Sequence, residues 1–121
     1  MKKFIINLPD RTDRLELFHK TNPNINAEPF GYVFDGRQID HDELIKLGFD
    51  TDKSWKDPIL QTHLTKGEVG CFLSHWYVWQ YAIESNETII VFEDDAIISD
   101  RYNEEEINEL LESYNFIYLG Y

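Results

Sequence analysis

A short apolar run, residues 88–92, constrains the fold of this chain more than any other feature. Its β-branched and aromatic residues are typical of a parallel strand that is covered on both faces. The run ends directly in Glu93, Asp94 and Asp95. Open α/β sheets bind ligands beyond the carboxyl ends of their strands, and neighbouring carboxylates repel one another unless a cation lies between them. The acids therefore indicate a divalent metal site, although a solvated turn explains them equally well when they are taken alone.

Strand and helix patterns alternate along the rest of the chain. Further strands are expected at residues 3–8, 30–34 and 115–119. Helices are expected at residues 10–20, opened by a capping box of Asp10 and Asp13, at 42–49 with a stop at Gly48, at 67–84, and after an Asn103 cap. Residues 50–65 show no periodicity and are expected to form a loop. This order predicts one α/β domain over residues 1–121, a three-layer, Rossmann-like fold with a mainly parallel sheet and helices on both faces.

The predicted helices carry apolar stripes at helical spacing. The stripe of the helix at 67–84 comprises Val69, Phe72, Leu73, Trp76, Trp79 and Ile83. The stripe of the last helix comprises Ile107, Leu110 and Leu111. We expect both stripes to face the core.

Charge and cysteine content narrow the class of partner. Eleven basic and 23 acidic residues give a net charge of −12, which argues against nucleic acid or an anionic membrane surface. An anionic small molecule stays compatible if a metal ion and a few basic residues neutralise it locally. No apolar run approaches the ~20 residues that cross a bilayer. The single cysteine, Cys71, excludes an internal disulfide, and we expect an intracellular, cytoplasmic protein.

Three predicted loops lie at the carboxyl ends of the strands. The loop at 7–14 offers Arg11 and Arg14, which suit phosphate at a helix start, although each could instead pair with a neighbouring acid. The loop at 35–37 is explained equally well as a tight turn. With the acids at 93–95, these loops would place basic residues on one side and acidic residues on the other side of a bound nucleotide diphosphate.

Cys71 and His75 are four residues apart on the helix predicted at 67–84, and Glu68 lies on the same stripe. Two such residues can share a metal ion, but a soft-metal site needs further ligands that the sequence does not identify. A small core cysteine and a hydrogen-bonded histidine are the more common outcome.

The chain resembles glycosyltransferase family 25, the lipopolysaccharide and procollagen galactosyltransferase type. The resemblance rests on blocks in the family's order: Ile6-Asn7-Leu8 with Arg11 and Arg14, Phe34-Asp35-Gly36, residues 64–75, residues 91–95 and residues 117–120. The most specific blocks are residues 67–75, with the sequence GEVGCFLSH, and 92–95, with the sequence FEDD.

This resemblance implies a GT-A fold, a UDP-sugar donor such as UDP-galactose or UDP-glucose, and Mn²⁺ or Mg²⁺. By position, Glu93 would face the ribose or sugar and, together with Asp95, would bind the metal as a DxD-like motif. Asp94 would orient the pair or contact the sugar. Asp94, Asp95 and His75 are the catalytic candidates. The remaining donor-binding candidates are Asn7, Leu8, Arg11, Arg14, Asp35 and Gly36.

Family domains continue past the last predicted strand, so the resemblance implies the nucleotide-sugar half of a transferase. Two activities follow: glycosyl transfer to a glycan or protein, with a homodimer or another partner completing the acceptor pocket, and UDP-sugar hydrolysis. The alternative is a non-catalytic remnant that binds a UDP-sugar or a protein partner. A receiver-like phosphotransfer domain fits poorly, because its acid pair follows the first strand, where this chain has Asn7-Leu8-Pro9.

Overall fold

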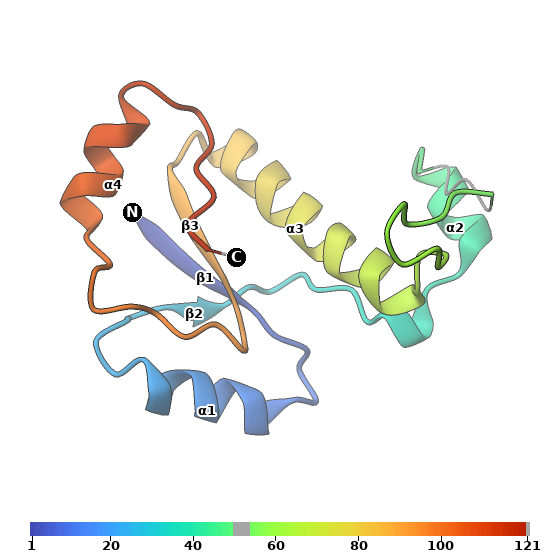
Figure 1. Ribbon diagram of the computed structural model, residues 1–121, viewed down its shortest axis with the longest axis horizontal. Coiled ribbons are helices and arrows are strands. Elements are labelled where there is room, and N and C mark those ends of the chain that lie inside the picture. The colour runs from blue at the N-terminus through green and yellow to red at the C-terminus, as the bar shows by residue number, and fades with distance from the viewer. Residues whose placement is uncertain (50–53, 121) are drawn as a thin grey trace.

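The computed structural model describes residues 1–49 and 54–120. Within these ranges, three parallel strands form a sheet in which β1 (Lys2–Ile6) lies between β2 (Glu28–Pro29) and β3 (Ile89–Glu93). The helices of the same ranges are α1 (Thr12–Thr21), α2 (His41–Lys46), α3 (Lys66–Ser85) and α4 (Glu104–Leu111), with one 3-10 turn, η1 (Gly36–Gln38). Figure 1 shows the strands at the centre, with α1, α3 and α4 around them.

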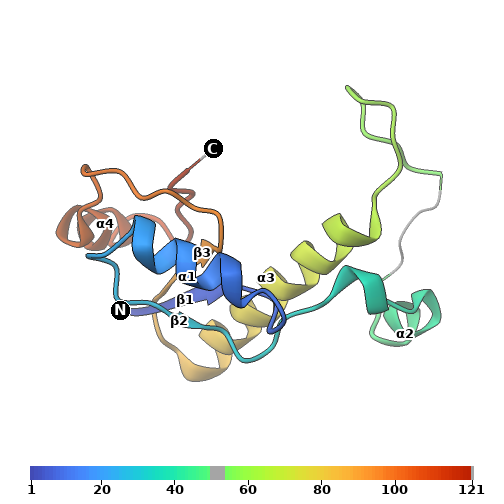
Figure 2. The same ribbon diagram turned by 90° about the horizontal axis from the view of Figure 1, so that it is seen from below.

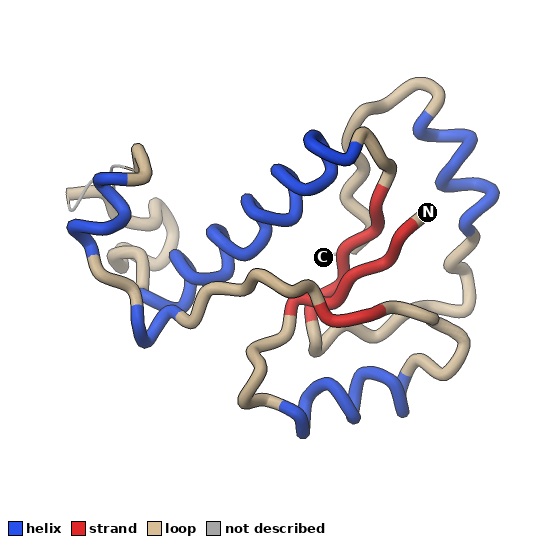
Figure 3. Tube along the Cα trace, turned by 180° about the vertical axis from the view of Figure 1, so that it is seen from behind, coloured by secondary structure: helices blue, strands red, loops and turns tan. Residues whose placement is uncertain are grey.

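The sheet is covered by a helix on each face. Successive side chains of a strand point to opposite faces, so Ile5 and Phe92 pack with Phe18 of α1. On the other face Phe4 packs with Val78 of α3. The strands accordingly lie between α1 and α3 in the view from behind (Figure 3). The predicted α/β fold with a parallel sheet is confirmed.

Two of the predicted strands are wrong. Pairing with β1 involves Glu28 and Pro29, and Phe30 N–H still donates to the Ile5 carbonyl (2.9 Å). The chain then leaves the sheet, because Phe34 N–H donates to Ser74 Oγ of α3 (2.9 Å). Residues 115–119 form no strand, and the Phe116 ring instead lies against Trp79, with 6.3 Å between ring centroids.

The core face of α3 also differs from the predicted stripe. Leu73 is buried as predicted, but Phe72 and Ile83 are exposed (48% and 71%). The buried face instead combines Leu73 and Val78 with two small residues, Gly70 and Ser74. Small side chains let the backbone of another segment approach closely. The buried face of α3 is therefore determined by its small residues, and it differs from the face that the apolar spacing predicts.

The helix ends follow local rules with one exception. The predicted capping box of Asp10 and Asp13 is wrong: the N-cap of α1 is Arg11, which makes no side-chain capping bond. The predicted Asn103 cap of α4 is confirmed, since Asn103 Oδ1 accepts bonds from two N–H groups of the first turn. Ile107 of the predicted α4 stripe is buried, whereas Leu110 is exposed.

Helix α2 and the described residues 54–65 lie apart from the sheet (Figure 2). α2 ends shortly before Gly48, which has a φ of +89°, the left-handed conformation expected of a helix stop. Residues 54–65 contain no helix or strand, as predicted, while residues 50–53 of that predicted loop are outside the described ranges. Seen from below, α2 and the green segment before α3 project away from the strands (Figure 2). None of the described helices has the length and apolar composition that crossing a membrane requires.

A buried asparagine connects α1 with the loop that follows β3. Asn22, at the C-terminal end of α1, donates from Nδ2 to the Ala96 carbonyl (3.0 Å). Its Oδ1 accepts a bond from Ile98 N–H (2.8 Å). Only 4% of Asn22 is exposed. The side chain thereby satisfies two backbone groups of the loop that follows β3.

Candidate functional site

Asn7 and the acids meet at one edge of the sheet. Ile6 pairs with Glu93, so the residues that follow β1 and β3 emerge side by side. Asn7 is buried, and its Nδ2 donates to Asp94 Oδ2 (2.8 Å) and to the Arg11 carbonyl (3.0 Å). Asn7 therefore fixes both Asp94 and the start of α1.

Arg14 is the basic residue that contacts both aspartates at this edge. Its guanidinium lies 2.6 Å from Asp94 Oδ1 and 2.9 Å from Asp95 Oδ2. The Asp94 side chain is only 12% exposed, whereas that of Asp95 is 67% exposed. Asp94 is thus enclosed by Asn7 and Arg14, and Asp95 faces solvent, where a ligand can reach it.

Glu93 points to the opposite helix. Its Oε1 lies 3.1 Å from His75 Nε2 and 3.7 Å from Cys71 Sγ, both on α3. Burial raises the pKa of the Cys71 thiol, and the charges of Glu93 and Asp95 raise it further. Cys71 is exposed, so the expectation of an ordinary core cysteine is wrong.

Glu68, the third polar residue of the predicted stripe, has a different role. Thr65 Oγ1 accepts a bond from Glu68 N–H, and Glu68 Oε2 accepts one from Thr65 N–H (2.6 Å). These reciprocal bonds form a capping box at the start of α3, and they lower the pKa of Glu68. The pattern Thr65-x-x-Glu68 is visible in the sequence and would have identified it.

The other residues predicted for the donor site make local contacts. Arg11 pairs with the neighbouring Asp13, the alternative to phosphate binding given above, and this pairing lowers the pKa of the Asp13 carboxyl. Arg14 instead contacts Asp94 and Asp95. The Leu8 carbonyl accepts a bond from Arg11 N–H in the turn before α1 (2.8 Å). Asp35 pairs with Arg37, which lowers the Asp35 pKa.

Arg37 lies in the candidate loop predicted at 35–37, but it was not among the predicted donor-binding residues. Its guanidinium lies 2.7 Å from Asp35 and 2.8 Å from Asp10, so it joins the turn at 35–37 to the loop after β1. Asp35 is two residues from Arg37 in the same predicted turn, whereas Asp10 is 27 residues away, and no sequence signal indicates that second pair. Arg37 is a second guanidinium near the carboxyl edge, and it is well exposed.

Gly36 has a structural reason to be glycine. A Cβ at this position would lie 2.3 Å from the Lys66 carbonyl oxygen at the start of α3. A Cβ at Gly70 would likewise lie 2.8 Å from Gly36 N. The two glycines let η1 and α3 touch backbone to backbone, which accounts for Gly36 without a ligand.

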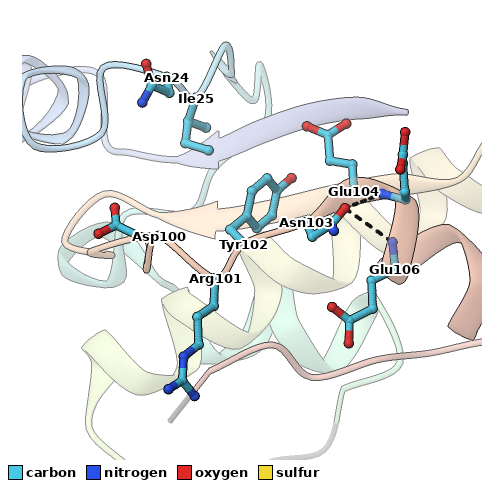
Figure 4. A pocket seen from close by; sticks show the side chains of 9 residues that line it. Asn24, Ile25, Asp100, Arg101, Tyr102, Asn103, Glu104 and Glu106 are labelled. Carbon is cyan, nitrogen blue, oxygen red and sulfur yellow. Dashed lines mark hydrogen bonds between the residues drawn. The ribbon is translucent and has the colours of Figure 1, made fainter.

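A hollow elsewhere on the molecule is a poorer candidate. Figure 4 shows it lined by Asn24, Ile25, Asp100, Arg101, Tyr102, Asn103, Glu104, Glu105 and Glu106. Its three consecutive glutamates belong to the first turn of α4, where acids are favourable, and Asn103 caps that turn. None of the predicted site residues lines this hollow. The carboxyl edge of β1 and β3 is therefore the candidate functional site.

Comparison with known proteins identifies relatives across the whole chain. The sequence model described as "Glycosyltransferase family 25 (LPS biosynthesis protein)" matches residues 1–121. "Glycosyltransferase 25 family member" of Aedes aegypti is 37% identical over 95 residues, 76% of this chain and 16% of that protein. "Inactive glycosyltransferase 25 family member 3" of Mus musculus is 37% identical over 128 residues, 97% of this chain and 21% of that protein.

A third relative is "Procollagen galactosyltransferase 1-A" of Xenopus laevis, 37% identical over 95 residues, 76% of this chain and 15% of that protein. The chain thus spans roughly a fifth or less of the length of the curated relatives it matches. No solved structure matches it.

Proposed function

This chain belongs to glycosyltransferase family 25, and we propose that it binds a UDP-sugar, UDP-galactose or UDP-glucose, together with Mn²⁺ or Mg²⁺ at the carboxyl edge of β1 and β3. The observation that carries the proposal is the convergence of Arg14 on Asp94 and Asp95 at this edge. A guanidinium beside carboxylates suits a diphosphate that is bridged to the protein by a divalent cation.

The donor atoms present fit a hard cation. Asp95 and Glu93 offer carboxylate oxygens, both on well-exposed side chains (67% and 52%). Oxygen ligands of this kind are those that Mg²⁺ and Mn²⁺ prefer. Such an ion, when bound, would act as a Lewis acid on the diphosphate that leaves the sugar.

Asn7 and Arg14 prepare the site for the donor. Asn7 holds the enclosed Asp94 carboxylate in place through its Nδ2 group. Arg14 pairs with Asp95, and its planar guanidinium can exchange that carboxylate for a phosphate. Asp95 would then be free to bind a cation, so this exchange would couple phosphate binding to metal binding.

The reaction after donor binding has two forms. In one, the sugar passes to an acceptor, a glycan or a protein, in a pocket completed by a homodimer or a partner. In the other, water accepts the sugar and UDP is released. The printed name of the Xenopus relative, a procollagen galactosyltransferase, favours galactose as the sugar.

Binding without transfer is the second candidate function. It is favoured by the relatives named inactive, from mouse and from human, which match 97% of this chain. Both candidates require the donor site, and they differ in UDP release. A UDP-release assay with UDP-galactose and Mn²⁺ separates them.

The test of the donor site is calorimetric titration of UDP, UDP-galactose and UDP-glucose, each with and without Mn²⁺. We expect metal-dependent binding that is lost in Asp95→Asn and weakened at least tenfold in Arg14→Gln. Asp100→Asn, an exposed acid remote from the edge, serves as the control and should bind like the wild type. Equal binding by Asp95→Asn, or no binding by the wild type, would contradict the proposal.

A further inference from the structure

Cys71, His75 and Glu93 bring three different ligand types together. Cys71 and His75 lie four residues apart on α3, one turn above the other, and Glu93 is the last residue of β3. One ligand atom from each lies within 4.8 Å of the other two. We propose that these three side chains bind one soft divalent cation of the Zn²⁺ class.

The distances suit tetrahedral coordination. Ligand bonds of ~2.0 Å to nitrogen or oxygen and ~2.3 Å to sulfur place two tetrahedral ligands about 3.3–3.6 Å apart. The observed separations from Glu93 Oε1 are 3.1 Å to His75 Nε2 and 3.7 Å to Cys71 Sγ. Small rotations of exposed side chains are enough to place all three atoms around one ion.

The chemistry distinguishes this site from the donor site. Thiolate and imidazole prefer Zn²⁺ to Mn²⁺ or Mg²⁺, whereas the site at Asp95 offers oxygen alone. Glu93 belongs to both candidate sites, but Cys71 and His75 belong only to the soft site as ligands. Glu68, on the same helix, is occupied by its capping box and supplies no ligand.

Three protein ligands leave a fourth position open. Cys71 is exposed and His75 is partly exposed, so water and ions reach the cluster without a structural rearrangement. A site with an open position holds a water molecule or a further ligand, unlike a closed four-ligand structural site. The cation would also connect the end of β3 to α3.

The experiment titrates the metal-free protein with Co²⁺, a spectroscopic substitute for Zn²⁺, without nucleotide. Because the chain has one cysteine, a thiolate-to-cobalt charge-transfer band reports on Cys71 alone. We expect the band to saturate at one ion per chain and to disappear when one equivalent of Zn²⁺ is added. Cys71→Ser should abolish it, and His75→Ala should weaken Co²⁺ binding at least tenfold.

His19→Gln, an exposed histidine on α1, is the matched control and should behave like the wild type. Circular dichroism spectra identify any variant that fails to fold; Glu93→Gln then provides the second test of the ligand set. The proposal is wrong if the wild type shows no charge-transfer band, or if the band is unchanged in folded His75→Ala and Glu93→Gln. Asp95→Asn should keep the band while losing UDP, so failure of the donor site and failure of the soft-metal site are distinguishable.

Discussion

The two faces of the sheet are packed in different ways, and the functional side chains differ accordingly. Against α1 the sheet buries large side chains, with Phe18 almost fully enclosed. On the α3 side the sheet packs through Phe4 and Phe30 on Val78. The earlier part of α3, with the small residues Gly70 and Ser74, instead makes close contact with the segment at 34–36, which lies outside the sheet. Helices in backbone contact have little freedom to rotate or slide, because backbone atoms cannot move aside as side chains do. Cys71 and His75 therefore project from α3 in a fixed direction.

Glu93 and Asp94 also have their side chains on different sides of the sheet. Glu93, the last residue of β3, alternates with Phe92 and reaches the α3 side. Asp94, in the turn that follows, reaches Asn7 and Arg14 on the α1 side. On the α1 side the carboxylate is matched by a guanidinium and an amide. On the α3 side it meets an imidazole and a thiol. One short acidic motif thus places carboxylates in two chemically different surroundings.

The largest expected effect tests the α1 face. Phe18→Ala removes a ring that is 1% exposed and packs on Phe92, with 5.8 Å between ring centroids. We expect the free energy of unfolding to fall by ~3–5 kcal/mol, measured by urea denaturation. Leu17→Ala, on the exposed side of the same helix, is the control and should change it by about 0.5 kcal/mol or less. Equal losses would show that α1 is not packed through Phe18.

An intermediate effect tests the α3 face. In Gly36→Ala the new methyl group meets the Lys66 carbonyl, a backbone atom that cannot turn away. We expect a loss of ~1–3 kcal/mol in the free energy of unfolding. Gly31→Ala has nothing within 4 Å of its Cβ and should be neutral or slightly stabilising in the same denaturation experiment. If the two alanines behave alike, the backbone contact does not fix α3.

The smallest effect concerns the start of α3. Thr65→Ala removes the hydroxyl of the capping box and should cost ~1 kcal/mol, while Thr65→Ser keeps the hydroxyl and most of the stability. Because the folded pKa of Glu68 lies below its usual value, its stabilisation is present above the usual carboxyl pKa. It is lost as pH falls through the folded pKa.

Stability curves at neutral pH and at pH below the Glu68 pKa therefore separate the capping bonds from other effects. The difference between wild type and Thr65→Ala should shrink at the lower pH, since a protonated Glu68 accepts the Thr65 bond less strongly. A difference that is independent of pH would contradict the assigned role of the Glu68 carboxylate.

Patterns within a single element were predictable from the sequence. The strand before the acids, the Asn103 cap and the stop at Gly48 each depend on a few neighbouring residues, and each is confirmed. Continuing the strand alternation past residue 92 would have placed Glu93 and Asp94 on opposite sides. The interpretation of residues 93–95 as acids that all face one ligand did not take this into account.

Contacts between distant segments were not predictable. The packed face of α3 depends on where the chain at 34–36 touches it, and apolar spacing carries no information about that contact. One local prediction also failed: the capping box expected at Asp13 does not form, because Asp13 pairs with Arg11 two residues away. Residues 30–34 look like a strand, but Ser74 takes the Phe34 hydrogen bond. The metal and nucleotide roles of the site residues stay predictions.

Asn22 has a consequence for the entropy of binding. The loop at 94–98 is joined to β3 at one end and to Asn22 through two hydrogen bonds at the other. Its conformational freedom is therefore lost when the chain folds, and little remains to be lost when a ligand arrives. A substitution of this asparagine, remote from any ligand, would move part of that entropic cost from folding to binding.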